Sequence, residues 1–236
     1  MDEKKNSFWK VKLFIGIPVL IILVFLCWPR ESGDTEAAMK RNIARERLTK
    51  LSDIEIQHVQ DFVLEDAGET MRGVIFSDAS DSWPGYYLHW YQLQEDGTFK
   101  LYWGGDGTSV GKMCDGVYSI AGLTLHGVDH SYDLYYVNDP KVSEFVIRFE
   151  YVLDEETREK QVEYGSVKVD RVPELICIPE FYEHEFAPEK LKGDDVTDRS
   201  CGTSISAFDE NGNLLSGAMA KNDDLTLHKV YTIEKY

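Results

Sequence analysis

The chain has 236 residues, of which 43% are hydrophobic, enough for a membrane segment and one domain with its own core. The formal net charge is −17, and it is uneven: the first 50 residues carry +4 and the remainder −21. Such an acidic body repels phosphate backbones and argues against nucleic acid as a partner. It favours a cationic partner, divalent ions or solubility alone.

The first predicted element is an apolar segment near the N-terminus. Residues 13–28 contain no charge, and the segment extends to about residue 8 if two lysines direct their amino groups to the membrane interface. This length predicts a transmembrane helix. Lysines precede the segment and acidic residues follow it, which places residues 1–12 in the cytoplasm and the rest of the chain outside it.

The end of this segment decides whether it is retained. A cleaved signal peptide ends in small residues, whereas this segment ends in FLCWP. A lipoprotein signal places a small residue before its cysteine, whereas Leu26 precedes Cys27. An uncleaved anchor is therefore the prediction, and lipidation at Cys27 is the main alternative.

Residues 29–52 are predicted to form a polar connector and a short juxtamembrane helix. The stretch TEAAMKRNIARERLTKL, residues 35–51, lacks Gly and Pro and has apolar residues at helical spacing. These residues are Ala38, Met39, Ile43, Leu48 and Leu51. The basic face of such a helix would contact lipid head groups, or the helix would pack against the domain that follows.

From about Met71 the chain consists of short β-branched and aromatic runs separated by turn residues, which is typical of antiparallel sheet. The pairs Asp96-Gly97 and Asn211-Gly212 predict tight hairpins, because they tolerate positive φ. A long loop is expected over residues 179–198. Strands are expected at residues 86–93, 98–103, 116–120, 123–128, 132–137, 143–153 and 161–172, in SISAF and NLLSGAM, and in the final LTLHKVYTIEKY.

Residues 53–236 are accordingly predicted to form an extracytoplasmic, acidic, all-β domain. Roughly eight to ten short strands at hairpin distances favour an antiparallel barrel or sandwich. The spacing of Gly, Tyr, Ile and Leu in GVYSIAGLTL resembles that of small lipocalin-like barrels. That resemblance implies a closed barrel with an apolar interior.

The glycine-rich stretch WGGDGTSVGK, residues 103–112, does not fit a phosphate-binding loop. Five residues separate Gly105 from Gly111, and Met follows Lys112 where Ser or Thr is required. No helix is expected after it, so a helix N-terminus that would face a phosphate is missing. We interpret this stretch as a connection between strands.

Neither metal binding nor catalysis is predicted. His126 and His130 would lie too far apart on a strand to share an ion. Nucleophile motifs such as G-x-S-x-G are missing, so no catalytic, cofactor or metal residue is assigned. The body contains three cysteines, Cys114, Cys177 and Cys201. Three cysteines permit at most one internal disulfide.

Eight aromatic residues lie between positions 83 and 103. Strand alternation places Tyr86 and Trp90 on one face and Tyr87 and Tyr91 on the other. Exposed rings would contact a protein, a small ligand or a glycan, whereas the alternative is that they fill the core. The candidate contact residues are Trp83, Tyr86, Tyr87, Trp90, Tyr91, Tyr102 and Trp103.

The sequence thus predicts a single-pass, membrane-anchored binding domain without catalytic activity or cofactor. One alternative is a lipocalin-like carrier, which requires a closed barrel around an apolar cavity. A second alternative is a hydrolase, which requires carboxylates that converge in a cleft.

Overall fold

A computed structural model of the chain describes residues 31–82, 85–102, 111–125, 128, 131–154, 159–179, 200–218, 225 and 230–236. The predicted membrane segment and residues 180–198 of the predicted long loop lie outside these ranges. Within them, no helix has the length and apolarity needed to cross a membrane. The second of two compact units, Ser32–Tyr236, contains every element described below.

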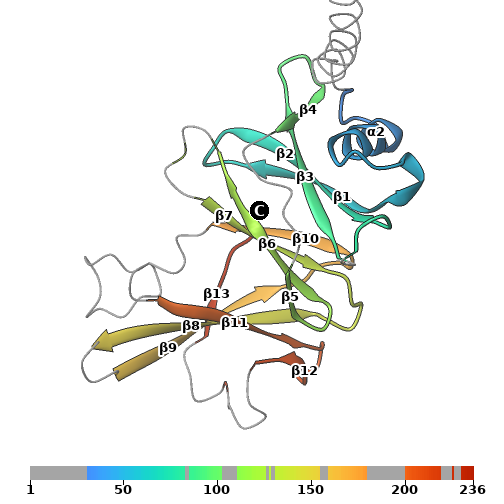
Figure 1. Ribbon diagram of the computed structural model, residues 1–236. Helices are drawn as coiled ribbons and strands as arrows, with labels where there is room; N and C mark the ends of the chain where they lie inside the picture. Colours follow the sequence, from blue (N-terminus) through green and yellow to red (C-terminus); the bar gives the residue numbers. More distant parts are fainter. Residues whose placement is uncertain are drawn as a thin grey trace, which may run out of the picture. The chain divides into compact units, whose positions relative to one another are not determined.

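The described part of the chain is mostly β-strand, as predicted (Figure 1). Its helical elements are α2 (Glu36–Glu46) and the 3-10 turn η1 (Leu51–Asp53). Its strands are β1 (Ile54–Leu64), β2 (Glu69–Asp78), β3 (Tyr87–Leu93), β4 (Phe99–Tyr102), β5 (Gly111–Cys114), β6 (Val117–Thr124), β7 (Ser131–Val137), β8 (Glu144–Asp154), β9 (Glu159–Lys168), β10 (Glu174–Pro179), β11 (Ser200–Phe208), β12 (Leu214–Gly217) and β13 (Val230–Thr232).

The strands form three open sheets. Sheet A has the order β1-β2-β3-β4, sheet B has β10-β7-β6-β5, and sheet C has β12-β11-β8-β9-β13. Neighbouring strands are antiparallel, except that β13 runs parallel to β9. The lipocalin-like closed barrel is therefore wrong for the described strands, because none of these three sheets closes on itself.

The sheets stack as layers, and this stacking explains why no barrel closes. One core, between α2 and sheet A, contains Ile43 and Tyr91. A second core contains residues of sheets A and B, including Trp90 and Leu175. A third contains residues of sheets B and C, including Phe145. Sheet B is apolar on both faces, so it is buried only when a layer covers each face.

The helix predicted within residues 35–51 is present as α2, but it is shorter than predicted and packs against the domain. Thr35 caps α2 by accepting a hydrogen bond from the amide of Ala38. Met39 and Ile43 are buried against sheet A. The compact unit therefore begins at Ser32, ahead of the predicted boundary at residue 53.

Most predicted strands are present, with differences where a bulge or a second buried face hides the alternation. The runs predicted at residues 116–120 and 123–128 lie largely in the single strand β6, which has a register shift between Ile120 and Leu123. Strands β1, β2, β5 and β10 were not predicted, and β5 includes Gly111 and Lys112 of the stretch that was interpreted as a connection. A register shift interrupts the alternation of β1 after Ile56, and every residue of β10 is buried. Both predicted hairpin glycines have positive φ, 80° at Gly97 and 76° at Gly212.

Candidate functional site

The candidate aromatic residues do not form one surface. Trp83 and Trp103 lie outside the described residues. Trp90 is buried in the core that includes sheets A and B, and Tyr87 and Tyr91 are buried in the core beneath α2. The predicted alternation between faces is confirmed, but a layer covers each face. These three rings therefore fill cores, as the alternative interpretation requires, and present no surface to a partner in this structure.

Tyr86 is half-buried and belongs to a group of rings that we call the tyrosine cluster: Tyr86, Tyr118 and Tyr136. The ring centroid of Tyr86 lies 5.1 Å from that of Tyr118 and 5.2 Å from that of Tyr136, both edge to face. Asn138 Nδ2 donates a hydrogen bond of 3.0 Å to the Tyr86 hydroxyl. Burial raises the pKa of Tyr136 to about 12, so its hydroxyl stays neutral at physiological pH.

The tyrosine cluster joins sheets A and B, and Tyr102 makes a second link between them. The Tyr102 hydroxyl donates a hydrogen bond of 3.1 Å to the carbonyl of Thr124. Sequence analysis missed Tyr118 and Tyr136 because they lie on sheet B, far from the aromatic-rich region in sequence. Only the stacking of two sheets brings these rings together.

A second feature is the attachment of residues 33–49 to sheet A; we call these residues the membrane-proximal segment because they follow the predicted anchor. Sequence analysis anticipated this attachment only as the alternative in which the helix packs against the domain. The segment makes contact from Gly33 onward, where the Gly33 amide donates a hydrogen bond of 2.6 Å to the carbonyl of Phe99. The Phe99 amide in turn donates to Asp34 Oδ1 at 3.0 Å. A Cβ at position 33 would lie 2.3 Å from Cδ1 of the buried ring of Tyr91, so only glycine fits here.

Arg72 fixes the same segment from strand β2. Its Nη1 donates a hydrogen bond of 3.0 Å to the Gly33 carbonyl. Its Nε and Nη2 form a bidentate pair with Asp61 at 2.6 and 2.8 Å, and its guanidinium carbon lies 3.8 Å from the ring centroid of Phe99. A planar guanidinium held on two sides and stacked on a ring is a rigid donor.

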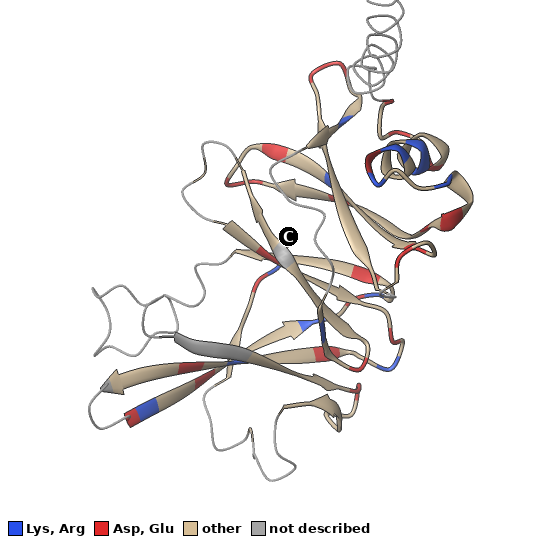
Figure 2. Ribbon diagram, in the orientation of Figure 1, with Lys and Arg blue, Asp and Glu red and all other residues tan. Residues whose placement is uncertain are grey.

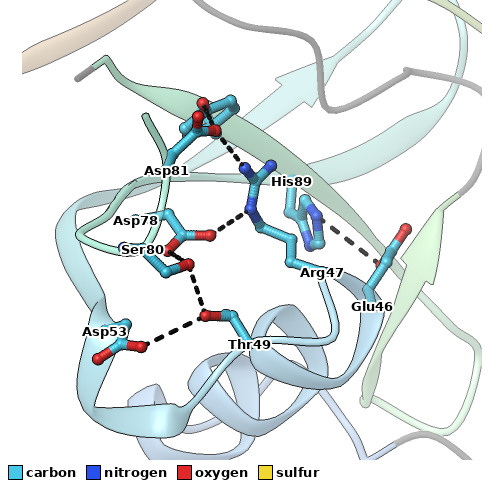
Figure 3. Close-up of polar contacts among 9 residues, drawn as sticks. Glu46, Arg47, Thr49, Asp53, Asp78, Ser80, Asp81 and His89 are labelled. Carbon is cyan, nitrogen blue, oxygen red and sulfur yellow. Dashed lines mark hydrogen bonds and ion pairs between the residues drawn. The ribbon is translucent and has the colours of Figure 1, made fainter. Parts of the chain in front are cut away.

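The other end of the segment is held by a polar group that we call the Arg47 clamp: Arg47, Thr49, Asp78, Ser80 and Asp81 (Figure 3). Arg47 Nε donates to Asp78 Oδ2 at 2.7 Å, and its Nη2 donates to Asp81 Oδ2 at 2.9 Å. Ser80 Oγ donates to Asp78 Oδ1 at 2.6 Å, and the hydroxyls of Thr49 and Ser80 lie 2.7 Å apart. The clamp joins the end of α2 to the end of β2.

Two aromatic contacts extend the clamp onto strand β3. The guanidinium carbon of Arg47 lies 3.9 Å from the ring centroid of Tyr87, whose hydroxyl donates to Asp81. Nearby, His89 Nε2 lies 3.8 Å from a carboxylate oxygen of Glu46 (Figure 3). The helix end is therefore attached to two neighbouring strands of sheet A.

The electrostatics of the clamp are those of a structural ion pair. Burial by itself would raise the pKa of Asp78, whose side chain is 3% exposed, but hydrogen bonds from Ser80 and Arg47 outweigh it and hold the pKa below its ordinary value. Burial would likewise lower the pKa of Arg47, but Asp78 and Tyr87 raise it. Both partners stay charged. A general acid for hydrolysis needs a raised carboxyl pKa, so this carboxylate pair does not suit catalysis.

Other candidate chemistry is missing from the described part of the chain. No three His, Cys, Asp or Glu side chains there gather closely enough to hold a metal ion. His126, His130 and the side chain of Cys201 lie outside the described residues. Cys114 belongs to the core that includes sheets B and C, and Cys177 belongs to the one that includes sheets A and B, so these two thiols do not pair.

Charge separates helix α2 from the rest of the domain. Lys and Arg gather on α2, whereas Asp and Glu are spread over the strands and turns of the three sheets (Figure 2). Comparison with known proteins adds no assignment, because no family model, no curated protein and no solved structure gives a significant match to the chain.

Proposed function

We propose that this protein is a membrane-anchored domain that binds a protein partner outside the cytoplasm and catalyses no reaction. The observation that carries the proposal is the attachment of the membrane-proximal segment to sheet A from Gly33 onward. Residues 29–32 alone separate that attachment from the predicted membrane segment. Such a short connector limits the distance between the predicted membrane segment and the point where the domain begins, which suits a domain that presents a surface to a neighbour.

The interior and the carboxylates of the domain favour binding over the alternatives. A carrier of an apolar ligand requires a cavity, whereas large rings such as Trp90 and Tyr132 fill the core that includes sheets A and B. A hydrolase requires carboxylates that exchange protons, whereas Asp78 and Asp81 are both bound to Arg47.

The tyrosine cluster is the proposed contact surface. Tyr86 and Tyr118 are half-buried, and amphipathic rings that pack against each other while remaining partly accessible are common in protein interfaces. A glycan usually stacks on the flat face of an exposed ring, which edge-to-face packing leaves less accessible. The acidic body favours a partner with a basic surface, because complementary charge accelerates association.

Site-specific photo-crosslinking in cells tests this proposal. A benzophenone amino acid replaces Tyr86 in the full chain, and a matched chain carries it at the exposed Glu210, in the turn between β11 and β12. We expect the chain to stay in the membrane fraction after an alkaline wash. We also expect a discrete protein adduct at position 86 that is at least about tenfold weaker at position 210, as a hot spot differs from the remaining surface.

Each part of the proposal has an outcome that contradicts it. The membrane anchor is contradicted if the alkaline wash releases the chain, or if the mature protein isolated from cells begins after residue 28. Equal adduct at positions 86 and 210 contradicts the tyrosine cluster as a contact surface. Illumination in 0.5 M salt should yield less adduct at position 86, because the Debye length falls to about 4 Å; an unchanged yield contradicts a partner with a basic surface.

A further inference from the structure

Helix α2 ends in a turn that presents two leucines to solvent. Leu48 is 81% exposed and Leu51 is 49% exposed, the former the largest exposed fraction among the large hydrophobic side chains of the described residues. Exposed leucines are common singly, but here they lie three residues apart on one turn. Lys50, between them, is also exposed.

The backbone of this turn is one in which glycine is normally favoured. The Thr49 amide bonds the Ala44 carbonyl at 2.9 Å, and the Leu48 amide bonds the Arg45 carbonyl at 3.4 Å, which is the pattern of a Schellman motif. Leu48 occupies its left-handed position, with φ of 54°. A leucine there is strained relative to glycine, and its side chain gains nothing by burial within the domain.

The backbone of this turn is held by side-chain contacts of alternate residues. Arg47 and Thr49 bind Asp78 and Ser80 within the Arg47 clamp, so the backbone between them is fixed. Leu48 and Lys50 consequently point outward. The turn therefore presents an apolar side chain next to an ammonium group without a cost in loop ordering on binding.

We infer that this turn, residues 48–51, inserts shallowly into the interfacial region of an anionic bilayer. The inference rests on the proposed membrane anchor. From residue 28 to Gly33 the chain can span at most about 18 Å, which allows the segment that begins at Gly33 to reach the bilayer surface. Leu48 and Leu51 lie on either side of one exposed lysine, Lys50, and residues 29–50 carry a net charge of +2 against a body of −21, a combination of apolar and basic side chains typical of interfacial membrane contacts.

The test uses the full chain in nanodiscs that contain phosphatidylglycerol and phosphatidylcholine. A benzophenone amino acid replaces Leu48 in one chain, and in the control it replaces Val63, which is 64% exposed on strand β1. We expect at least about a tenfold excess of lipid adduct at position 48, and a fall in that excess in discs of phosphatidylcholine alone, because the basic residues then lack anionic head groups.

A second variant separates membrane contact from folding. Leu48→Gly should raise Tm by about 2 to 4 °C, because glycine relieves the strain at positive φ. The same variant should reduce lipid adduct from a probe at Leu51 by at least about threefold, because the neighbouring apolar anchor is lost. A structural role alone would move only Tm.

Several outcomes overturn the inference. Equal lipid adduct at positions 48 and 63 in incorporated chains contradicts membrane contact while leaving the anchor intact. A protein adduct or a crosslinked dimer in place of lipid shows that another chain covers the turn. Failure of the chain to enter nanodiscs contradicts the anchor, and with it this inference.

Discussion

Removal of the Arg47 guanidinium is the sharpest perturbation of the attachment between α2 and sheet A. In Arg47→Ala, the carboxylate of Asp78 stays buried with Ser80 as a remaining donor and loses its cation. Breaking a buried ion pair from one side costs about 3–5 kcal/mol. The Arg47 side chain is partly exposed, so solvent screens part of this interaction, and we expect a loss of about 2–3 kcal/mol.

The assay is thermal unfolding of the full chain in detergent, followed by tryptophan fluorescence. A loss of about 2–3 kcal/mol corresponds to a fall in Tm of about 4–12 °C for a domain of this size. Lys112→Ala is the control, because Lys112 forms an exposed ion pair of 2.6 Å with Asp115. That pair is expected to contribute less than about 1 kcal/mol.

A double-mutant cycle with Asp78→Asn identifies the source of the loss. If Arg47 acts through Asp78, the double variant is more stable than the sum of the two single losses predicts, by at least about 1 kcal/mol. Additive losses, or an Arg47→Ala effect no larger than that of Lys112→Ala, would refute the reasoning. Hydrogen exchange should show faster opening of α2 in Arg47→Ala, because the helix end then loses its contacts with Asp78 and Asp81 and keeps weaker polar contacts and its apolar face.

Three further predictions concern acid stability, close packing and the C-terminal segment. The folded-state pKa of Asp78 lies below its ordinary value, so its ionisation stabilises the fold above about pH 4. This contribution is lost as pH falls through the folded-state pKa. Asp78→Asn should therefore flatten the acid side of the curve of unfolding free energy against pH, measured by urea unfolding. Gly33→Ala places a Cβ against Tyr91 and should cost about 1–3 kcal/mol in the same assay. Gly111→Ala, whose Cβ would make an ordinary contact of 3.9 Å with the Ser119 carbonyl oxygen, should cost less than about 1 kcal/mol. Lys235 Nζ lies 2.8 Å from the buried carboxylate of Glu174. Lys235→Met should therefore lower Tm by about 2–8 °C. An unchanged Tm would show that this buried carboxylate does not depend on its cation.

The sequence by itself determined the local elements of this protein. Hairpins with Asp-Gly and Asn-Gly turns formed where predicted, because those residues tolerate positive φ at Gly97 and Gly212. Residues 143–153 were correctly predicted as a strand, and their alternation places Phe145 and Ile147 on the same buried face of β8. Helical spacing located α2 and its buried residues Ala38, Met39 and Ile43, whereas Leu48 and Leu51, which the same spacing included, lie beyond the helix and are exposed. These features depend on neighbours in the chain, which a sequence displays directly.

The tertiary structure alone decided how many layers the strands form and which side chains meet. Alternation of Trp90 and Tyr91 indicated two faces, but whether each face meets water or another layer depends on segments distant in sequence. Gln60 shows the same dependence: its side chain donates to the carbonyl of Leu175 at 2.7 Å and accepts from its amide at 3.2 Å, which joins sheet A to sheet B across 115 positions.

The candidate sites follow the same division. The tyrosine cluster combines a residue that the sequence marked, Tyr86, with two that it did not. The Arg47 clamp was invisible to sequence analysis, because Arg47 and Asp78 are 31 positions apart and are ordinary charged residues in an acidic chain. What distinguishes Asp78 from the other carboxylates is burial beside one guanidinium, and burial is a property of the packed layers and not of the local sequence.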